Sequence, residues 1–193
     1  MVLLTYFEPF GKRCTNASMD VALSLPYDSI ELPVRWKGID NKLSQIQEIN
    51  PDVLILLGEA GTYDKVTIEL ASRNHCNGID NEGIEKISEK IDEQMPDMIY
   101  TNVVFDSSFH YSYNAGKYLC NYTYFKALST LTIKKIVFIH VPYINENFEQ
   151  IINEVNLIID YIVKIWNEKN IYCCFANLFL DNCCILLERK EQW

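Results

Sequence analysis

Short apolar runs alternate with amphipathic stretches along most of this chain. Residues 2–6, 53–57 and 134–140 are continuous apolar runs, the pattern of strands that are buried on both faces of a sheet. Residues 17–25 and 41–49 lie between such runs and have the spacing of short helices. Because strands that alternate with helices form βαβ units, the pattern predicts an α/β fold with a largely parallel sheet.

The other segments complete this alternation. Asn16 or Ser18 is a candidate cap for the first helix. Residues 74–97 are polar and mixed, which predicts a long surface segment. Further strands are predicted at 29–36, 65–71, 98–105 and 109–113, helices at 117–131 and 146–167, and two short strands within 171–187.

One cysteine stands where a strand passes into a helix. Ser112 and Gly116 bound a turn-forming stretch, and the residues from Lys117 onward read as the first turns of a helix. Cys120 is therefore expected near a helix N-terminus, where unpaired N–H groups favour a thiolate. A thiolate is a strong nucleophile. The alternative is a buried structural thiol, because cysteine is among the most buried residue types.

A histidine and a glutamate supply candidate partners for this cysteine. His140 ends the apolar run 134–140, and ligands of α/β sheets bind at the carboxyl ends of strands. Glu69 stands in the otherwise apolar strand 65–71, where a buried carboxylate needs a partner. Nucleophile, base and orienting carboxylate would then be complete. The alternatives are a core histidine and a solvated edge glutamate.

Four ordered blocks connect these residues to a known family. The blocks are Phe7-Glu-Pro-Phe10-Gly11 with Asn16 and Ser18 after it, Leu57-Gly58-Glu59-Ala60-Gly61 with Ile68-Glu69 after it, Tyr113-Asn-Ala-Gly116 through Leu119-Cys120-Asn121, and Phe138-Ile-His140-Val-Pro-Tyr143. Through them the chain resembles the pyroglutamyl peptidase type I (pyrrolidone-carboxylate peptidase) family from residue 1 to about 143. The resemblance implies one domain over residues 1–193, a three-layer sandwich whose twisted, mostly parallel central sheet has helices on both faces.

The resemblance also implies a mechanism and a set of site residues. Cys120 would be the nucleophile, His140 the general acid and base, and Glu69 the group that orients His140, in a cysteine peptidase that removes N-terminal pyroglutamyl residues from peptides. Phe7 and Phe10 resemble an aromatic pair that sandwiches the pyrrolidone ring. The remaining pocket residues would be Glu59, Ile79, Tyr118 and Leu119. Asn121 is expected to hold the local backbone.

Several positions depart from the family pattern, and they concern the pocket more than the triad. Glu59 stands where the family usually has Gln, and Tyr63 and Leu70 stand where it has Arg. One stretch of the family is shortened to residues 78–81, and two segments, a helix between Phe105 and Phe109 and a loop after the histidine block, are missing. Two alternatives therefore stay open: a Cys-dependent hydrolase of another amide or lactam, and an inactive family-like binding protein with an unreactive Cys120.

Composition and charge exclude some classes of binding partner. Seventeen basic against 26 acidic residues give a net charge of −9, which argues against nucleic acid as a partner. The chain lacks a run of 18 apolar residues, so no membrane span is predicted. The N-terminal residues read as a strand and not as a signal peptide, and a cytoplasmic location is predicted.

Cys173-Cys174 and Cys183-Cys184 lack the spacing of metal ligands. No metal or cofactor is expected, and the resemblance implies a homo-oligomer, dimer or tetramer.

Overall fold

The computed structural model describes residues 1–144 and 147–165. The chain divides into two compact units, residues 1–156 and residues 157–193. All the strands and the three helices α1 to α3 described below belong to the first unit. The prediction of one domain over residues 1–193 stays a prediction.

A six-stranded sheet forms the centre of the first unit, with the order β2-β1-β3-β10-β4-β9. Its first four strands are parallel, β4 runs antiparallel to β10, and β9 is parallel to β4. The strands are β1 (Val2–Phe7), β2 (Asp28–Leu32), β3 (Val53–Glu59), β4 (Thr67–Glu69), β9 (Tyr111–Ser112) and β10 (Lys135–Val141). The three continuous apolar runs are thus β1, β3 and β10, the adjacent central strands, as their buried pattern predicts.

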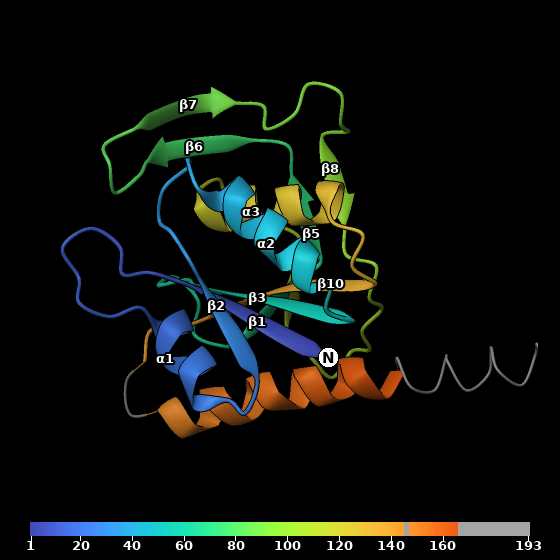
Figure 1. The fold of residues 1–193 in the computed structure, drawn as a ribbon. Helices are drawn as coiled ribbons and strands as arrows, with labels where there is room; N and C mark the ends of the chain where they lie inside the picture. The colour runs from blue at the N-terminus through green and yellow to red at the C-terminus, as the bar shows by residue number, and fades with distance from the viewer. Residues whose placement is uncertain (145–146, 166–193) are drawn as a thin grey trace, which may run out of the picture. The chain divides into compact units, whose positions relative to one another are not determined.

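Helices lie on both faces of this sheet (Figure 1). Helix α1 (Ala17–Ser24) lies on one face, and α2 (Ile39–Ile49) and α3 (Leu119–Thr130) lie on the other. Asn16 caps α1, because its side chain accepts a hydrogen bond from Ser18 N. The α/β fold with a mostly parallel central sheet is confirmed. Residues 148–165 are also helical, within the predicted range 146–167.

The predicted strand 65–71 is wrong as one element. It divides at Leu70 into β4, which pairs with β10, and β5 (Ala71–Arg73), which pairs with β8 (Met98–Tyr100) in a separate two-stranded sheet. Leu70 N donates to Ser112 O in one direction, and Leu70 O accepts from Thr101 N in the other. The chain therefore changes partners at Leu70 while it stays extended, and apolar spacing does not report a change of partner.

The polar segment 74–97 contains an antiparallel hairpin, β6 (Cys76–Ile79) and β7 (Glu85–Glu89). Most residues of β7 are exposed, in agreement with the predicted surface position. Other predicted strands are shorter than expected. Strand β2 ends at Leu32 before Pro33, and β8 and β9 cover only part of 98–105 and 109–113.

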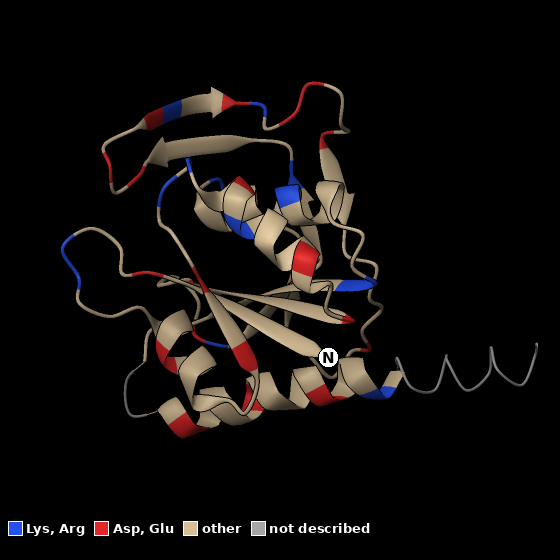
Figure 2. Ribbon diagram, viewed as in Figure 1, with Lys and Arg blue, Asp and Glu red and all other residues tan. Residues whose placement is uncertain are grey.

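Charged residues of both signs are interspersed over the described elements (Figure 2). The loop between β1 and α1 carries the basic pair Lys12 and Arg13. No helix in the described ranges is long and apolar enough to cross a bilayer. The two strands predicted within 171–187, and the four cysteines of the Cys-Cys pairs, lie outside the described residues.

Candidate active site

The carboxyl ends of three parallel strands meet at one edge of the central sheet. Strand β1 ends at Phe7, while Gly58 and Glu59 of β3 are in register with His140 and Val141 of β10. Backbone bonds hold this edge together, for example Ala60 N to Val141 O at 2.9 Å. The edge is the one at which parallel sheets bind ligands, as the position of His140 predicts.

Cys120 is the second residue of α3 and is partly exposed. Tyr118 precedes the helix and, in the described chain, provides no side-chain cap for the N–H groups at its start. These N–H groups carry the positive end of the helix dipole. A Cβ atom on Gly58 would lie 3.0 Å from Cys120 Sγ, so the thiol lies directly above the end of β3. Cys120 thus lies in the positively polarised first turn of α3, next to the carboxyl end of β3.

His140 and Glu69 form a buried hydrogen-bonded pair. His140 Nδ1 lies 2.8 Å from Glu69 Oε1, and Cys120 is near enough to His140 to influence the pKa of its ring. Glu69 is 0% exposed, which excludes the solvated edge position. Burial alone would lower the pKa of His140, but its interactions with Cys120 and Glu69 outweigh burial and raise the pKa to about 9. The ring is therefore positively charged near neutral pH, and this charge lies close to Cys120.

Other groups hold the carboxylate of Glu69. Tyr63 donates its hydroxyl to Oε1 at 3.1 Å, and Asn114 N donates to Oε2 at 3.2 Å. Burial alone would raise the pKa of Glu69, but the hydrogen bonds, led by that to His140, lower it. The Tyr63 ring also meets the His140 ring edge to face at 5.6 Å. Sequence reasoning missed Tyr63 and Asn114, because their spacing from Glu69 carries no signal.

A cavity of about 210 Å³ opens beside Cys120. Five of the predicted pocket residues line it, namely Phe7, Phe10, Glu59, Tyr118 and Leu119. Ile79 is not among the lining residues, although its carbonyl accepts a hydrogen bond from the Tyr118 hydroxyl at 2.8 Å. The prediction missed Arg13, Asn16, Val34, Gly61 and Tyr143, which also line the cavity. The cavity therefore combines aromatic walls with an ion pair, which is described below.

Aromatic contacts connect the cavity to the core. Tyr118 meets Phe10 edge to face at 5.6 Å and meets Trp36 at 5.3 Å. Asn81 holds the loop that carries Phe10, since it accepts from Gly11 N and donates to Pro9 O. Phe10 is 47% exposed at the mouth of the cavity, whereas Phe7 is 3% exposed within it. A flat ring in this cavity would meet several aromatic side chains.

Asn121 fixes the start of α3, in line with its expected backbone role. It is 0% exposed. Its Nδ2 donates to Arg73 O and His75 O, both at 2.8 Å, and its Oδ1 accepts from Ser72 Oγ and Arg73 N, both at 2.9 Å. One side chain thus joins the residue after Cys120 to the segment that includes β5.

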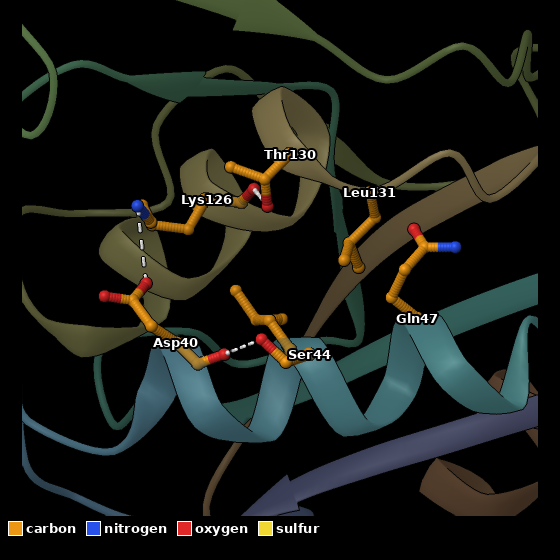
Figure 3. Close-up of a pocket in the computed structure, with 7 residues that line it drawn as sticks. Asp40, Ser44, Gln47, Lys126, Thr130 and Leu131 are labelled. Atoms are coloured by element: carbon orange, nitrogen blue, oxygen red, sulfur yellow. Dashed lines mark hydrogen bonds and ion pairs between the residues drawn. The ribbon is translucent and has the colours of Figure 1, made fainter.

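A depression between α2 and α3 is a second hollow of the surface (Figure 3), with a volume of about 360 Å³. Lys126 and Asp40 form an ion pair across it at 3.3 Å, and Ser44, Gln47 and Thr130 add neutral polar groups. Its lining contains no cysteine and no histidine. Among the described residues, no three His, Cys, Asp or Glu side chains gather where they could share a metal ion. The cavity beside Cys120 is therefore the candidate active site.

Gly58→Ala tests how closely the nucleophile lies against β3. The new Cβ would lie 2.6 Å from Phe138 Cζ and 3.0 Å from Cys120 Sγ, so both side chains must move. We expect a roughly tenfold lower kcat/KM, about 1.4 kcal/mol, and an overpacking cost of about 1–3 kcal/mol in unfolding. Steady-state kinetics and urea denaturation measure the two effects separately. An unchanged kcat/KM would contradict the close approach of Cys120.

Known proteins of one family are similar to this chain over most of its length. The family model described as pyroglutamyl peptidase matches residues 1–165. The chain is 35% identical to the pyrrolidone-carboxylate peptidase of Thermococcus litoralis, over 74% of this chain and 76% of the relative. It is 29% identical to that of Finegoldia magna, over 79% of this chain and 82% of the relative. The solved structure of the Thermococcus litoralis pyrrolidone carboxyl peptidase matches with a TM-score of 0.78 and 28% identity, covering 87% of this chain and 95% of that one. That of Fervidobacterium islandicum matches with a TM-score of 0.72 and 26% identity, covering 84% of this chain and 98% of that one.

Proposed function

Because the chain belongs to the pyroglutamyl peptidase family, a family of cysteine peptidases, we propose that Cys120, His140 and Glu69 hydrolyse the bond after an N-terminal pyroglutamyl residue. The observation that carries the proposal is the buried His140–Glu69 hydrogen bond together with Cys120, which influences the pKa of His140 and lines an aromatic cavity. The substrate is a peptide whose first residue is pyroglutamate.

In the first step Cys120 attacks the carbonyl carbon of the pyroglutamyl residue. The negative charge that forms on the carbonyl oxygen is stabilised by the N–H groups at the start of α3. His140 then transfers its proton to the nitrogen of the leaving amine, the C–N bond breaks, and a thioester with Cys120 remains. The raised pKa of His140 supports this step, because the ring still holds its proton at neutral pH.

In the second step water hydrolyses the thioester. His140, now neutral, accepts a proton from the attacking water, and the Cys120 thiolate leaves as pyroglutamate is released. Glu69 keeps its charge, accepts from Nδ1 and stabilises the imidazolium in both steps. His140 is 5% exposed and Glu69 is 0% exposed, so this charge interaction is little screened by solvent.

The cavity supports recognition of a small flat lactam. Phe7 and Phe10 flank the ring, Leu119 and Tyr118 supply further apolar surface, and Glu59 supplies an acceptor for the lactam N–H. Ile79 contributes through its carbonyl, which holds the Tyr118 hydroxyl. Assembly into a dimer or tetramer stays a prediction, to be measured by sedimentation velocity.

Hydrolysis of a pyroglutamyl-arylamide tests the proposal directly. The purified chain is expected to release the arylamine, whereas Cys120→Ala is expected to release none above background. Prolyl- and glutamyl-arylamides are the matched controls, because proline lacks the lactam and glutamate has the open chain. If all three substrates are inert while Cys120 is reactive, the chain acts on another amide. If Cys120 is unreactive as well, the chain is an inactive family member.

Alkylation separates thiolate character from exposure. Cys14 is exposed and Cys76 is buried, while Cys120 is partly exposed. We expect iodoacetamide to label Cys120 faster than Cys14 at pH 7, because Cys120 lies at the start of α3 and close to the positively charged ring of His140, an environment typical of reactive cysteines. Burial raises the pKa of Cys76, so that thiol should react most slowly of the three cysteines that the structure describes. Peptide mapping by mass spectrometry gives the rates. Faster labelling of Cys14 would mean that exposure alone governs reactivity.

A further inference from the structure

One wall of the cavity beside Cys120 is an ion pair. Glu59 ends β3, and its side chain is 9% exposed. Arg13 lies in the loop between β1 and α1 and is 39% exposed. Its two terminal nitrogens face the two carboxylate oxygens, Nη1 against Oε1 and Nη2 against Oε2 at 2.9 Å. This bidentate fork fixes the plane of the carboxylate as well as its position.

Both members of the ion pair have additional support. Ala17 N, at the start of α1, donates to Glu59 Oε2 at 2.7 Å. The Arg13 guanidinium lies over the Tyr143 ring at 5.0 Å. That ring packs on the backbone of Gly61, where a Cβ atom would come within 2.3 Å of it. Three donors thus hold the Glu59 carboxylate, which can accept about four hydrogen bonds.

The charge of Glu59 matters because of where it stands. The proposed reaction places negative charge on the substrate oxygen in the same cavity. A second, uncompensated anion would oppose that charge, and about 1.4 kcal/mol of such repulsion lowers the rate tenfold. A guanidinium keeps its positive charge at every working pH, so it compensates the carboxylate throughout. Arg13 also lines a neighbouring depression together with Glu59 and Tyr143, so it lies between that depression and the active-site cavity.

Resting on the proposed function, we propose that Arg13 is a positioning residue that neutralises Glu59 and holds its carboxylate in place. The cavity then offers an acceptor to the lactam N–H of the substrate and stays electrically neutral while the oxyanion forms. Arg13 acts through Glu59 and not through its own contact with the substrate.

A double-mutant cycle tests this inference. Arg13→Met keeps an unbranched apolar stem against Tyr143 and removes the charge. We expect it to lower kcat on a pyroglutamyl-arylamide about tenfold when Glu59 is present, and less than about threefold in the Glu59→Gln background. Arg13→Lys restores a positive charge without the bidentate contact. It should recover most of kcat, while KM remains above the wild-type value.

Three results would overturn the inference. One is an equal loss of kcat for Arg13→Met in both backgrounds, which would mean that Arg13 only shapes the cavity or contacts the substrate itself. The second is no loss at all, and the third is an Arg13→Lys variant as slow as Arg13→Met. Calorimetric titration with 2-pyrrolidone gives a readout without catalysis. If the wild-type chain is inactive but Arg13→Met weakens 2-pyrrolidone binding only when Glu59 is present, the proposed reaction fails and the role of Arg13 stands. If that binding is unchanged by Arg13→Met, the role of Arg13 fails.

Discussion

Glu69→Gln is expected to lower kcat on a pyroglutamyl-arylamide by roughly a thousandfold, about 4 kcal/mol, while the fold persists. The amide keeps the shape of the side chain, and its single oxygen can still accept from one of the two donors, Tyr63 at the Oε1 position or Asn114 N at the Oε2 position. It loses the charge that stabilises the imidazolium of His140. It also has an NH₂ group that can donate to Nδ1. The ring proton would then sit on Nε2, and Nε2 could no longer accept a proton from Cys120.

The same substitution should change the pH dependence of the reaction. The pKa of His140 is about 9, so activity in the wild-type chain should fall as the pH rises through about 9 and the ring loses the proton for the leaving amine. Glu69 is one cause of that raised pKa, so the alkaline loss should move to lower pH in Glu69→Gln. NMR titration of the His140 ring measures the shift without catalysis.

Glu31→Gln is a suitable control, because Glu31 is exposed on β2 and lies outside the candidate site. It should leave both kcat and the His140 titration at wild-type values. A Glu69→Gln variant with near wild-type kcat would show that another group orients His140.

Asn121→Asp is expected to cause the largest loss of stability. Aspartate keeps the two acceptor bonds from Ser72 and Arg73 but cannot donate to Arg73 O and His75 O. Both carbonyls would then face a carboxylate in a site that is 0% exposed. At about 1–3 kcal/mol for each unsatisfied buried group, the free energy of unfolding should fall by about 4 kcal/mol. That corresponds to a decrease in Tm of about 10 °C.

This substitution should also slow alkylation of Cys120 at temperatures where the variant is folded, because Asn121 holds the helix start that orients the thiol. Urea denaturation measures the stability, and peptide mapping measures the alkylation. Asn41→Asp, an exposed position on α2, serves as the control and should change neither. If Asn121→Asp had the same free energy of unfolding as the control, the four hydrogen bonds would contribute little to the stability of the folded state.

Local pattern predicts the elements that carry the site. Strands β1, β3 and β10 are apolar along their whole length, and that pattern is typical of central strands whatever surrounds them. The Asn16 cap of α1 and the helix start at Cys120 depend on residues within a few positions of each other. Because parallel strands end at a common edge, the sequence also predicts that His140 meets a ligand there.

What the sequence alone determined is therefore the α/β fold, the central strands, the family, and the three residues that the structure brings together as a candidate triad. The tertiary structure decided the pairing of β4 and β5 with different sheets, the Tyr63 bond to Glu69, and the neutralisation of Glu59 by Arg13. Apolar periodicity reports whether a segment is extended and which of its faces is buried. It carries no information about which distant segment completes its hydrogen bonds or balances its charge, and Arg13 and Glu59 are 46 positions apart in the chain.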